Sequence, residues 1–310
     1  MSKNILVNKR LLSHSALLST AVIYGLTYHF AKGVMPNALN PIAFVSIRAL
    51  FAVPVFFLAS LWIPKETIKK EDYFRIFLCA LFGIVINQVA FFSGLMYTTP
   101  VSSSIIMTTN PILVIIIAYF LLNESITRNR ILGITLGIIG AFIIILSGNQ
   151  IDVHNAPNPL LGNFLVFVNA FSYALYLVLV KPLMQKYHPL HIIKWVMLIG
   201  GCMIVPFGLL GDRALLTASW KTFDTTIYYQ IAFVLIFTSC LAYFLNLSAL
   251  RYLKPATVSV YIYGQPLIAT LFSVFFLENG ETLTYQKIIA TFLIFIGVYL
   301  VSKPAKTKKL

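Results

Sequence analysis

The stretch PVSSSIIMTTNP at residues 100–111 returns, 155 positions later, as PATVSVYIYGQP at residues 255–266. Each copy opens an apolar segment with one proline and carries a second proline directly behind a side-chain amide, Asn110 or Gln265. Inside a helix, a proline removes one backbone hydrogen bond and clashes with the carbonyl four residues earlier. Each copy therefore predicts a helix that is broken near its middle, at the second proline.

The composition of the whole chain excludes a soluble globular domain. Hydrophobic residues make up 59% of the 310 residues and charged residues only 10%. Apolar segments of about 20 residues, enough to cross a hydrocarbon layer of roughly 30 Å, recur along the chain. We expect an all-α integral membrane protein with ten membrane-spanning helices, at about residues 12–32, 41–62, 74–97, 101–122, 130–147, 160–181, 190–211, 226–250, 256–277 and 285–302.

The basic residues are distributed unevenly around these spans. With the N-terminus in the cytoplasm, eighteen of the 23 Lys and Arg residues fall at cytoplasmic ends of spans and four at the opposite ends. The remaining one, Arg48, lies inside the second span. This bias predicts a multi-pass protein of the cell (inner) membrane with both termini in the cytoplasm. It also accounts for the net charge of +14 without a nucleic-acid partner.

The repeat extends beyond the two proline segments. Tyr24 of the first span, for example, corresponds to Tyr173 of the sixth. We therefore expect two five-helix repeats, residues 1–150 and residues 151–310. Because five is odd, the second repeat must have the opposite orientation in the membrane, which is the inverted-repeat arrangement of many secondary transporters.

In their order and spacing, these features resemble the drug/metabolite transporter superfamily, in particular its EamA-like permeases. The resemblance rests on the two sets of five spans, the two amide-proline breaks, and Pro41 followed by Arg48 in the second span. It covers about residues 15–302 and implies a secondary transporter of small metabolites, often an exporter of amino acids. We expect alternating access around a central cavity, whereas the solute itself is not specified.

Polar side chains are costly in lipid and should face the interior of the bundle. The spacing of Asn169, Tyr173 and Tyr176, for example, places all three on one face of a helix, which we expect to point inward. Each such residue could either bind a solute or join two helices by a hydrogen bond. The candidate cavity residues are Tyr24, Tyr28, Arg48, Asn87, Gln88, Thr108, Asn110, Asn169, Tyr173, Tyr176, Tyr243, Asn246, Tyr263 and Gln265, with Pro111 and Pro266 as the helix breaks.

Arg48 is the one charge placed well inside a predicted span. Its fork of donors could anchor a carboxylate of the solute. Alternatively it caps helix-end carbonyls, or extends outward to the membrane surface. All nine acidic residues lie in predicted loops or at helix ends, which disfavours a proton-coupled exporter of lipophilic cations.

Other function classes find little support in the residues. The chain has no phosphate-binding glycine loop and no cluster of His, Asp and Glu in a span, so we expect no enzyme, no cofactor and no metal site. An intramembrane enzyme and a nucleotide-sugar or other anionic-metabolite carrier are the alternatives. The close spacing of Gly133 and Gly137 would suit either a homodimer or packing against the tenth span.

Overall fold

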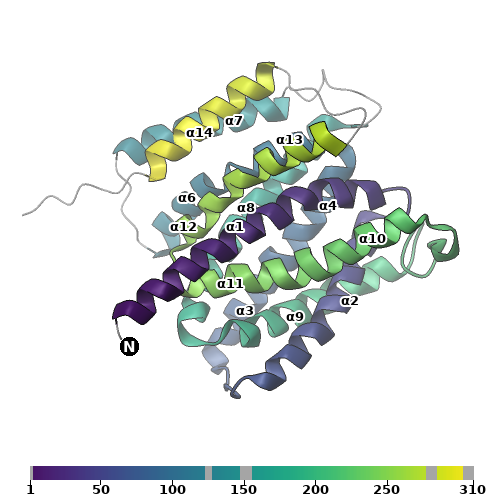
Figure 1. The fold of residues 1–310 in the computed structure, drawn as a ribbon, viewed down its shortest axis with the longest axis horizontal. Helices are drawn as coiled ribbons and strands as arrows, with labels where there is room; N and C mark the ends of the chain where they lie inside the picture. The colour runs from purple at the N-terminus through teal and green to yellow at the C-terminus, as the bar shows by residue number, and fades with distance from the viewer. Residues whose placement is uncertain (1–2, 123–127, 147–155, 277–284, 303–310) are drawn as a thin grey trace, which may run out of the picture.

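The computed structural model describes residues 3–122, 128–146, 156–276 and 285–302, and within these ranges the chain is helical and has no strand (Figure 1). Such a fold follows from the long apolar runs, since only a helix bonds all of its own backbone groups without water. The α-helices are α1 (Lys3–Val34), α2 (Pro41–Ala59), α3 (Tyr73–Ala80), α4 (Ile86–Tyr97), α5 (Pro100–Met107), α6 (Asn110–Leu122), α7 (Arg128–Leu146), α8 (Pro159–Lys186), α9 (Pro189–Leu209), α10 (Thr225–Phe233), α11 (Tyr243–Tyr252), α12 (Pro255–Val260), α13 (Gly264–Phe276) and α14 (Tyr285–Ser302).

Shorter elements connect or extend these helices. Three-residue 3₁₀ turns occupy 60–62, 70–72, 220–222 and 261–263, and π-helical segments occupy 81–85 and 234–242. The π segments join α3 to α4 and α10 to α11 without a loop. Each of these helix–π–helix stretches is therefore one continuous rod.

Proline sets where many of the helices begin. It stands at the first position of α2, α5, α8, α9 and α12, where the missing N–H costs nothing. A polar residue often precedes it and accepts a backbone N–H, as Asn40 does from Ala43 and Thr99 from Ser102. These signals place helix starts within one residue of the predicted spans that begin at 41, 101, 160, 190 and 256.

Six helical stretches of the described residues are long and apolar enough to cross a membrane, namely 41–62, 70–97, 100–122, 159–186, 189–209 and 225–252. Shorter apolar segments lie within α7 and α14. The remaining predicted spans, at 12–32 and 256–277, are occupied by α1 and by α12 with α13. An all-helical membrane bundle is thus confirmed, whereas the expected total of ten spans is not reached by this measure.

The surface of the bundle is apolar. Large apolar side chains are exposed on many of its helices, and Phe142, Phe207 and Phe275, for example, are 59%, 70% and 74% exposed, as expected of a surface that faces lipid. In contrast, 72% of the 18-residue apolar segment within α5–α6 is buried, the largest such share among the six stretches. The proline-broken stretch of the first half therefore lies inside the bundle, surrounded by helices that face lipid.

Helices pack in pairs drawn from distant parts of the chain. Figure 1 shows α7 beside α14 at one edge of the bundle, and α2 with α9 at the opposite edge. Between them, α1 packs on α11 and α13, while α4 packs on α8. The boundary predicted between residues 150 and 151 lies outside the described residues.

Glycines allow the closest of these crossings. A Cβ atom on Gly162 of α8 would lie 2.7 Å from the Thr98 nitrogen and 2.8 Å from the Gly94 oxygen. At the other crossing, a Cβ on Gly297 of α14 would lie 2.5 Å from the Gly133 oxygen. The glycines of the fifth predicted span, Gly133 and Gly137, thus contact α14 of the same chain. This is the packing against the tenth span that their spacing allowed.

We expect Gly162→Ala to destabilise the protein, because the new methyl group meets backbone atoms that cannot move aside independently. The cost should be roughly 1–3 kcal/mol, seen as a lower melting temperature of the purified protein in detergent. Gly201→Ala is the matched control, since its Cβ would meet Ala49 Cβ at an ordinary 3.4 Å. Equal melting temperatures for the two variants would contradict this account of the α4–α8 crossing.

Candidate functional site

The first copy of the repeated stretch is interrupted between α5 and α6. The α5 helix ends at Met107 and α6 begins at Asn110, so the break lies at Thr108 and Thr109, just before Pro111. Both threonine hydroxyls donate to carbonyls of the preceding turn, Thr108 to Ile105 at 2.5 Å and Thr109 to Ile106 at 2.8 Å. The chain therefore bonds part of the broken turn with its own side chains.

The second copy is interrupted by a 3₁₀ turn at Tyr261–Tyr263, after which α13 begins at Gly264. Here too the irregular turn comes shortly before the proline, Pro266, rather than at it. A proline restrains the residues that precede it and removes a donor needed one turn earlier. This explains why the irregular backbone in both copies lies on the N-terminal side of the proline.

The two amides beside the prolines bond to different helices. Asn110 Nδ2 donates to the Ala170 carbonyl of α8 at 2.7 Å, and Gln265 Oε1 accepts from the Tyr28 hydroxyl of α1 at 2.8 Å. Both amide residues are at most 3% exposed. They therefore fix each broken helix to the first long helix of the other half of the chain.

A partly open cavity borders both broken helices. The centre of a water-sized sphere can move through about 70 Å³ of this cavity. One bound water needs roughly 10–15 Å³ on the same measure, so the cavity has room for several waters. Met107, the last residue of α5, and Gln265, near the start of α13, both border it. The complete lining is Tyr24, Thr27, Tyr28, Arg48, Asn87, Gln88, Phe91, Phe92, Met107, Asn169, Tyr173, Thr238, Tyr243 and Gln265.

Nine of the fourteen candidate residues belong to this lining, namely Tyr24, Tyr28, Arg48, Asn87, Gln88, Asn169, Tyr173, Tyr243 and Gln265. The other five lie outside it for separate reasons. Thr108 and Asn110 bond to backbone carbonyls as described above, and Tyr176 packs on the glycine at position 83. Tyr263 packs against Phe295, with ring centroids 5.5 Å apart.

Asn246 borders a second, much smaller cavity that shares Tyr24, Tyr173 and Gln265 with the first. Its amide nitrogen donates to the Tyr24 hydroxyl at 3.2 Å. Tyr24 therefore stands between the two spaces, held by a polar partner on the side away from the main cavity.

Some lining residues were not among the candidates. Thr27 and Thr238 share a hydrogen bond of 2.7 Å between their hydroxyls, a pairing of positions 211 apart that no local pattern indicates. Phe91, Phe92 and Met107 could not be distinguished by type from apolar residues that face lipid. Only the position of each residue on its folded helix identifies this group.

Polar contacts across the cavity join both halves of the chain. Gln88 Nε2 donates to the Tyr243 hydroxyl at 2.9 Å, and Asn169 Nδ2 donates to the Asn87 carbonyl at 2.9 Å. Gln88 follows the π segment 81–85, and Tyr243 follows the π segment 234–242. Extra residues in a helical turn shift the following side chains around the axis, and such segments are frequent at functional sites.

Arg48 of α2 is 3% exposed and lines the same cavity. Its Nε donates to Ser239 Oγ at 2.8 Å, and its guanidinium carbon lies 4.6 Å from the centroid of the Phe92 ring. A cation over an aromatic face is stabilised by the ring quadrupole. These two contacts hold the guanidinium in one position.

Two lysines bond to helix C-termini in a corresponding way. Lys32 donates to the carbonyls of Leu95, Met96 and Thr98 at 2.8–2.9 Å. Lys181 donates to the carbonyls at positions 250 and 253, at 2.6 and 2.8 Å. A cation is favourable at a helix C-terminus because it meets free carbonyls and the negative end of the dipole.

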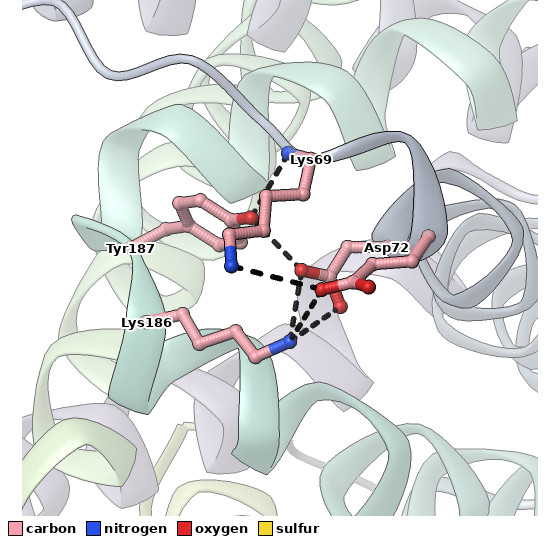
Figure 2. A network of polar contacts seen from close by, with 5 residues as sticks. Lys69, Asp72, Lys186 and Tyr187 are labelled. Atoms are coloured by element: carbon pink, nitrogen blue, oxygen red, sulfur yellow. Dashed lines mark hydrogen bonds and ion pairs between the residues drawn. The ribbon is translucent and has the colours of Figure 1, made fainter.

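A network of charged groups joins the turn before α3 to the end of α8 (Figure 2). The Asp72 carboxylate accepts from Lys186 Nζ at 3.0 Å and from the Tyr187 hydroxyl at 2.8 Å. The same tyrosine oxygen accepts the Lys69 N–H at 3.0 Å. Asp72 is buried, whereas the Lys186 side chain is 46% exposed. These contacts thus join the two halves of the chain at this end of the bundle.

Neighbouring contacts extend this network. The Glu66 carboxylate accepts the His188 N–H at 2.7 Å, and His191 Nε2 lies 2.8 Å from the Pro64 oxygen. Burial, with help from the positive Arg251, lowers the pKa of His188, so its ring is neutral at pH 7 and Nδ1 can accept a backbone N–H. Among the described residues, no group of three His, Cys, Asp or Glu side chains could hold a metal ion.

Comparison with known proteins identifies relatives over nearly the whole chain. The EamA-like transporter family matches residues 11–146 and 160–303. An uncharacterized transporter, YyaM, of Bacillus subtilis (strain 168) is 25% identical over 297 residues, covering 95% of this chain and 94% of the relative. An uncharacterized transporter of Archaeoglobus fulgidus is 26% identical over 285 residues, 92% and 96% of the two chains.

The fold also matches a solved structure. One crystal structure superimposes with a TM-score of 0.63 at 16% identity and covers 96% of this chain and 97% of the other. At this identity the match shows the fold alone.

For the Asp72 network we expect unequal effects of removing its two charges. Lys186→Met should lower the melting temperature more than Asp72→Asn, because it leaves a buried carboxylate without its cation. Asp72→Asn leaves a half-exposed lysine that water can solvate. Lys70→Met, at an exposed lysine of the same turn, is the control and should have little effect. The opposite order of the two effects would show that the network does not stabilise the buried carboxylate.

Proposed function

Because the chain belongs to the EamA-like transporter family, we propose that it is a secondary transporter that moves a small metabolite across the membrane by alternating access. One observation carries this proposal. The cavity borders both broken helices, through Met107 on one side and Gln265 on the other. Broken helices near the centre of a membrane bundle are where secondary transporters bind their solutes.

The proposed architecture is ten membrane-spanning helices in two inverted five-helix repeats. The lysine contacts support it: Lys32 and Lys181 are equivalent positions, and each bonds to the C-terminus of an equivalent helix, α4 or α11. Shifted by the repeat offset of 155, the first π segment falls within the second. The same offset relates Gln88 to Tyr243, which bond to each other. Equivalent positions in contact would lie beside the axis that relates the two repeats.

In this mechanism the two repeats rock around the cavity, so the contacts that close one end must open in the other state. The Asp72 network joins residues 64–72 of the first repeat to residues 186–191 of the second. By the charge bias this end lies in the cytoplasm. We therefore propose that these contacts hold the cytoplasmic end together. Hydrogen bonds from Asn40 to Asp212 and from Arg213 to Pro36 join the repeats at the other end as well.

The proposed solutes are small metabolites, with amino-acid export as the leading case. A nucleotide-sugar or other anionic-metabolite carrier is the second candidate, and it would require several basic residues around the cavity. Arg48 is the only Lys or Arg in the lining that the described residues form. An enzyme is not favoured, because that lining includes no His, Asp, Glu or Cys.

Uptake into proteoliposomes tests the function directly. We expect vesicles that contain the protein to accumulate at least one radiolabelled member of a panel of amino acids and small organic acids, above the level of empty vesicles. Gln265→Leu removes the Tyr28 contact, worth about 1 kcal/mol, and should reduce uptake about fivefold. Gln286→Leu, in α14 and away from the cavity lining, is the matched control. No uptake of any solute above empty vesicles would contradict the transporter proposal.

Reporter fusions test the proposed orientation in the cell membrane. Alkaline phosphatase fused behind Leu310 should be inactive, and green fluorescent protein at the same site should fluoresce, because both report a cytoplasmic C-terminus. A phosphatase inserted after Leu216, in the loop between α9 and α10, should be active. The reverse activities would show that the chain is inserted the other way.

A further inference from the structure

Arg48 has no negative partner among the described residues. No carboxylate of these residues lies within 4.0 Å of its guanidinium nitrogens, and their ion pairs join only Lys69 or Lys186 to Glu71 or Asp72. The ionisable groups that influence Arg48 are Tyr243, Tyr24 and Cys240. Tyrosine and cysteine are ordinarily neutral at pH 7. The cavity therefore carries one uncompensated positive charge.

The structure gives Arg48 neither of the structural roles that its sequence position left open. At 3% exposure its side chain does not extend to the membrane surface. No backbone carbonyl of the described residues accepts a hydrogen bond from it, so it caps no helix end; its protein hydrogen bond goes to Ser239. A buried cation is costly, and an ionisable residue inside a membrane span is for that reason a candidate for a functional site.

The contacts of Arg48 also leave the terminal nitrogens of its fork available. Nε is occupied by Ser239 Oγ, and Ser239 donates its own proton to the Val234 carbonyl at 2.9 Å. The serine oxygen is thereby oriented to accept from Nε. The Phe92 ring covers one face of the guanidinium. Neither terminal nitrogen bonds to any residue that the structure describes, and two parallel N–H groups match the two oxygens of a carboxylate.

We propose that Arg48 binds the carboxylate of the transported solute, and that the site accepts small carboxylates, both amino acids and organic acids, while it rejects analogues that lack this group. The inference rests on the proposed function and sharpens its solute class. Tyr24, Tyr28 and Gln88 line the same cavity and supply hydroxyl and amide groups for the rest of the solute.

Thermal stabilisation of the purified protein by matched solute pairs tests this inference, because a ligand that binds only the folded state raises its melting temperature. The pairs are leucine with leucinamide, alanine with alaninamide, and pyruvate with pyruvamide. We expect at least one acid to raise the melting temperature of the wild-type protein, and its amide to do so at concentrations about tenfold higher or not at all.

The variants separate recognition from folding. Arg48→Met replaces an unpaired charge with an apolar side chain of similar length, so it should fold and lose about tenfold or more in affinity for the acid. Arg213→Met is the control, because this arginine lies in the α9–α10 loop and donates to Pro36 instead. If Arg48→Met does not fold, Arg48→Lys takes its place as the test variant. Lysine keeps the positive charge but lacks the fork of donors, so this variant should bind the acid severalfold more weakly than the wild type.

Failure of the inference and failure of the transporter proposal give different results. Equal stabilisation by an acid and its amide, or unchanged affinity for the acid in the Arg48 variants, would overturn the carboxylate assignment while uptake in proteoliposomes continues. Absence of uptake and of stabilisation for every solute, charged or neutral, would instead contradict transport itself.

Discussion

The structure depends on one constraint, the need to bond every backbone N–H and C=O where water is absent. Most of the chain meets it with continuous helices, even though α2, α8 and α9 each contain an interior proline, whereas the two copies of the repeated stretch are interrupted just before theirs. In the first copy the broken turn is buried, and its own Thr108 and Thr109 hydroxyls bond carbonyls of the preceding turn. A polar interior is the consequence, and the cavity lies within it.

The same polar interior connects the packing of the bundle to its proposed action. The contacts between repeats include hydrogen bonds beside the cavity, such as Gln88 to Tyr243, and ionic contacts at one end, such as Lys186 to Asp72. Hydrogen bonds such as Asn40 to Asp212 join the repeats at the other end. Glycines at the helix crossings hold the helices close without interlocking side chains. A bundle of this kind can change the contacts at its ends while the residues around a solute remain together.

The sequence predicts much of the fold, since proline and polar N-caps mark helix starts and apolar length marks the spans. It also identifies Arg48, Tyr28 and Gln265, because polar residues inside a span must face protein. It does not distinguish Asn110, which bonds to a helix backbone, from Gln265, which borders the cavity. That difference depends on how far each broken helix is rotated. Phe92 was not predicted for a related reason: apolar residues suit both lipid and a cavity wall.

A structure determined with a transported solute at saturating concentration tests the central claim most directly. The account predicts solute density in the cavity between the two helix breaks, with a negative group against Arg48 and a further contact to Gln265. Density for the solute at any other place, with this cavity unchanged and empty, would contradict it.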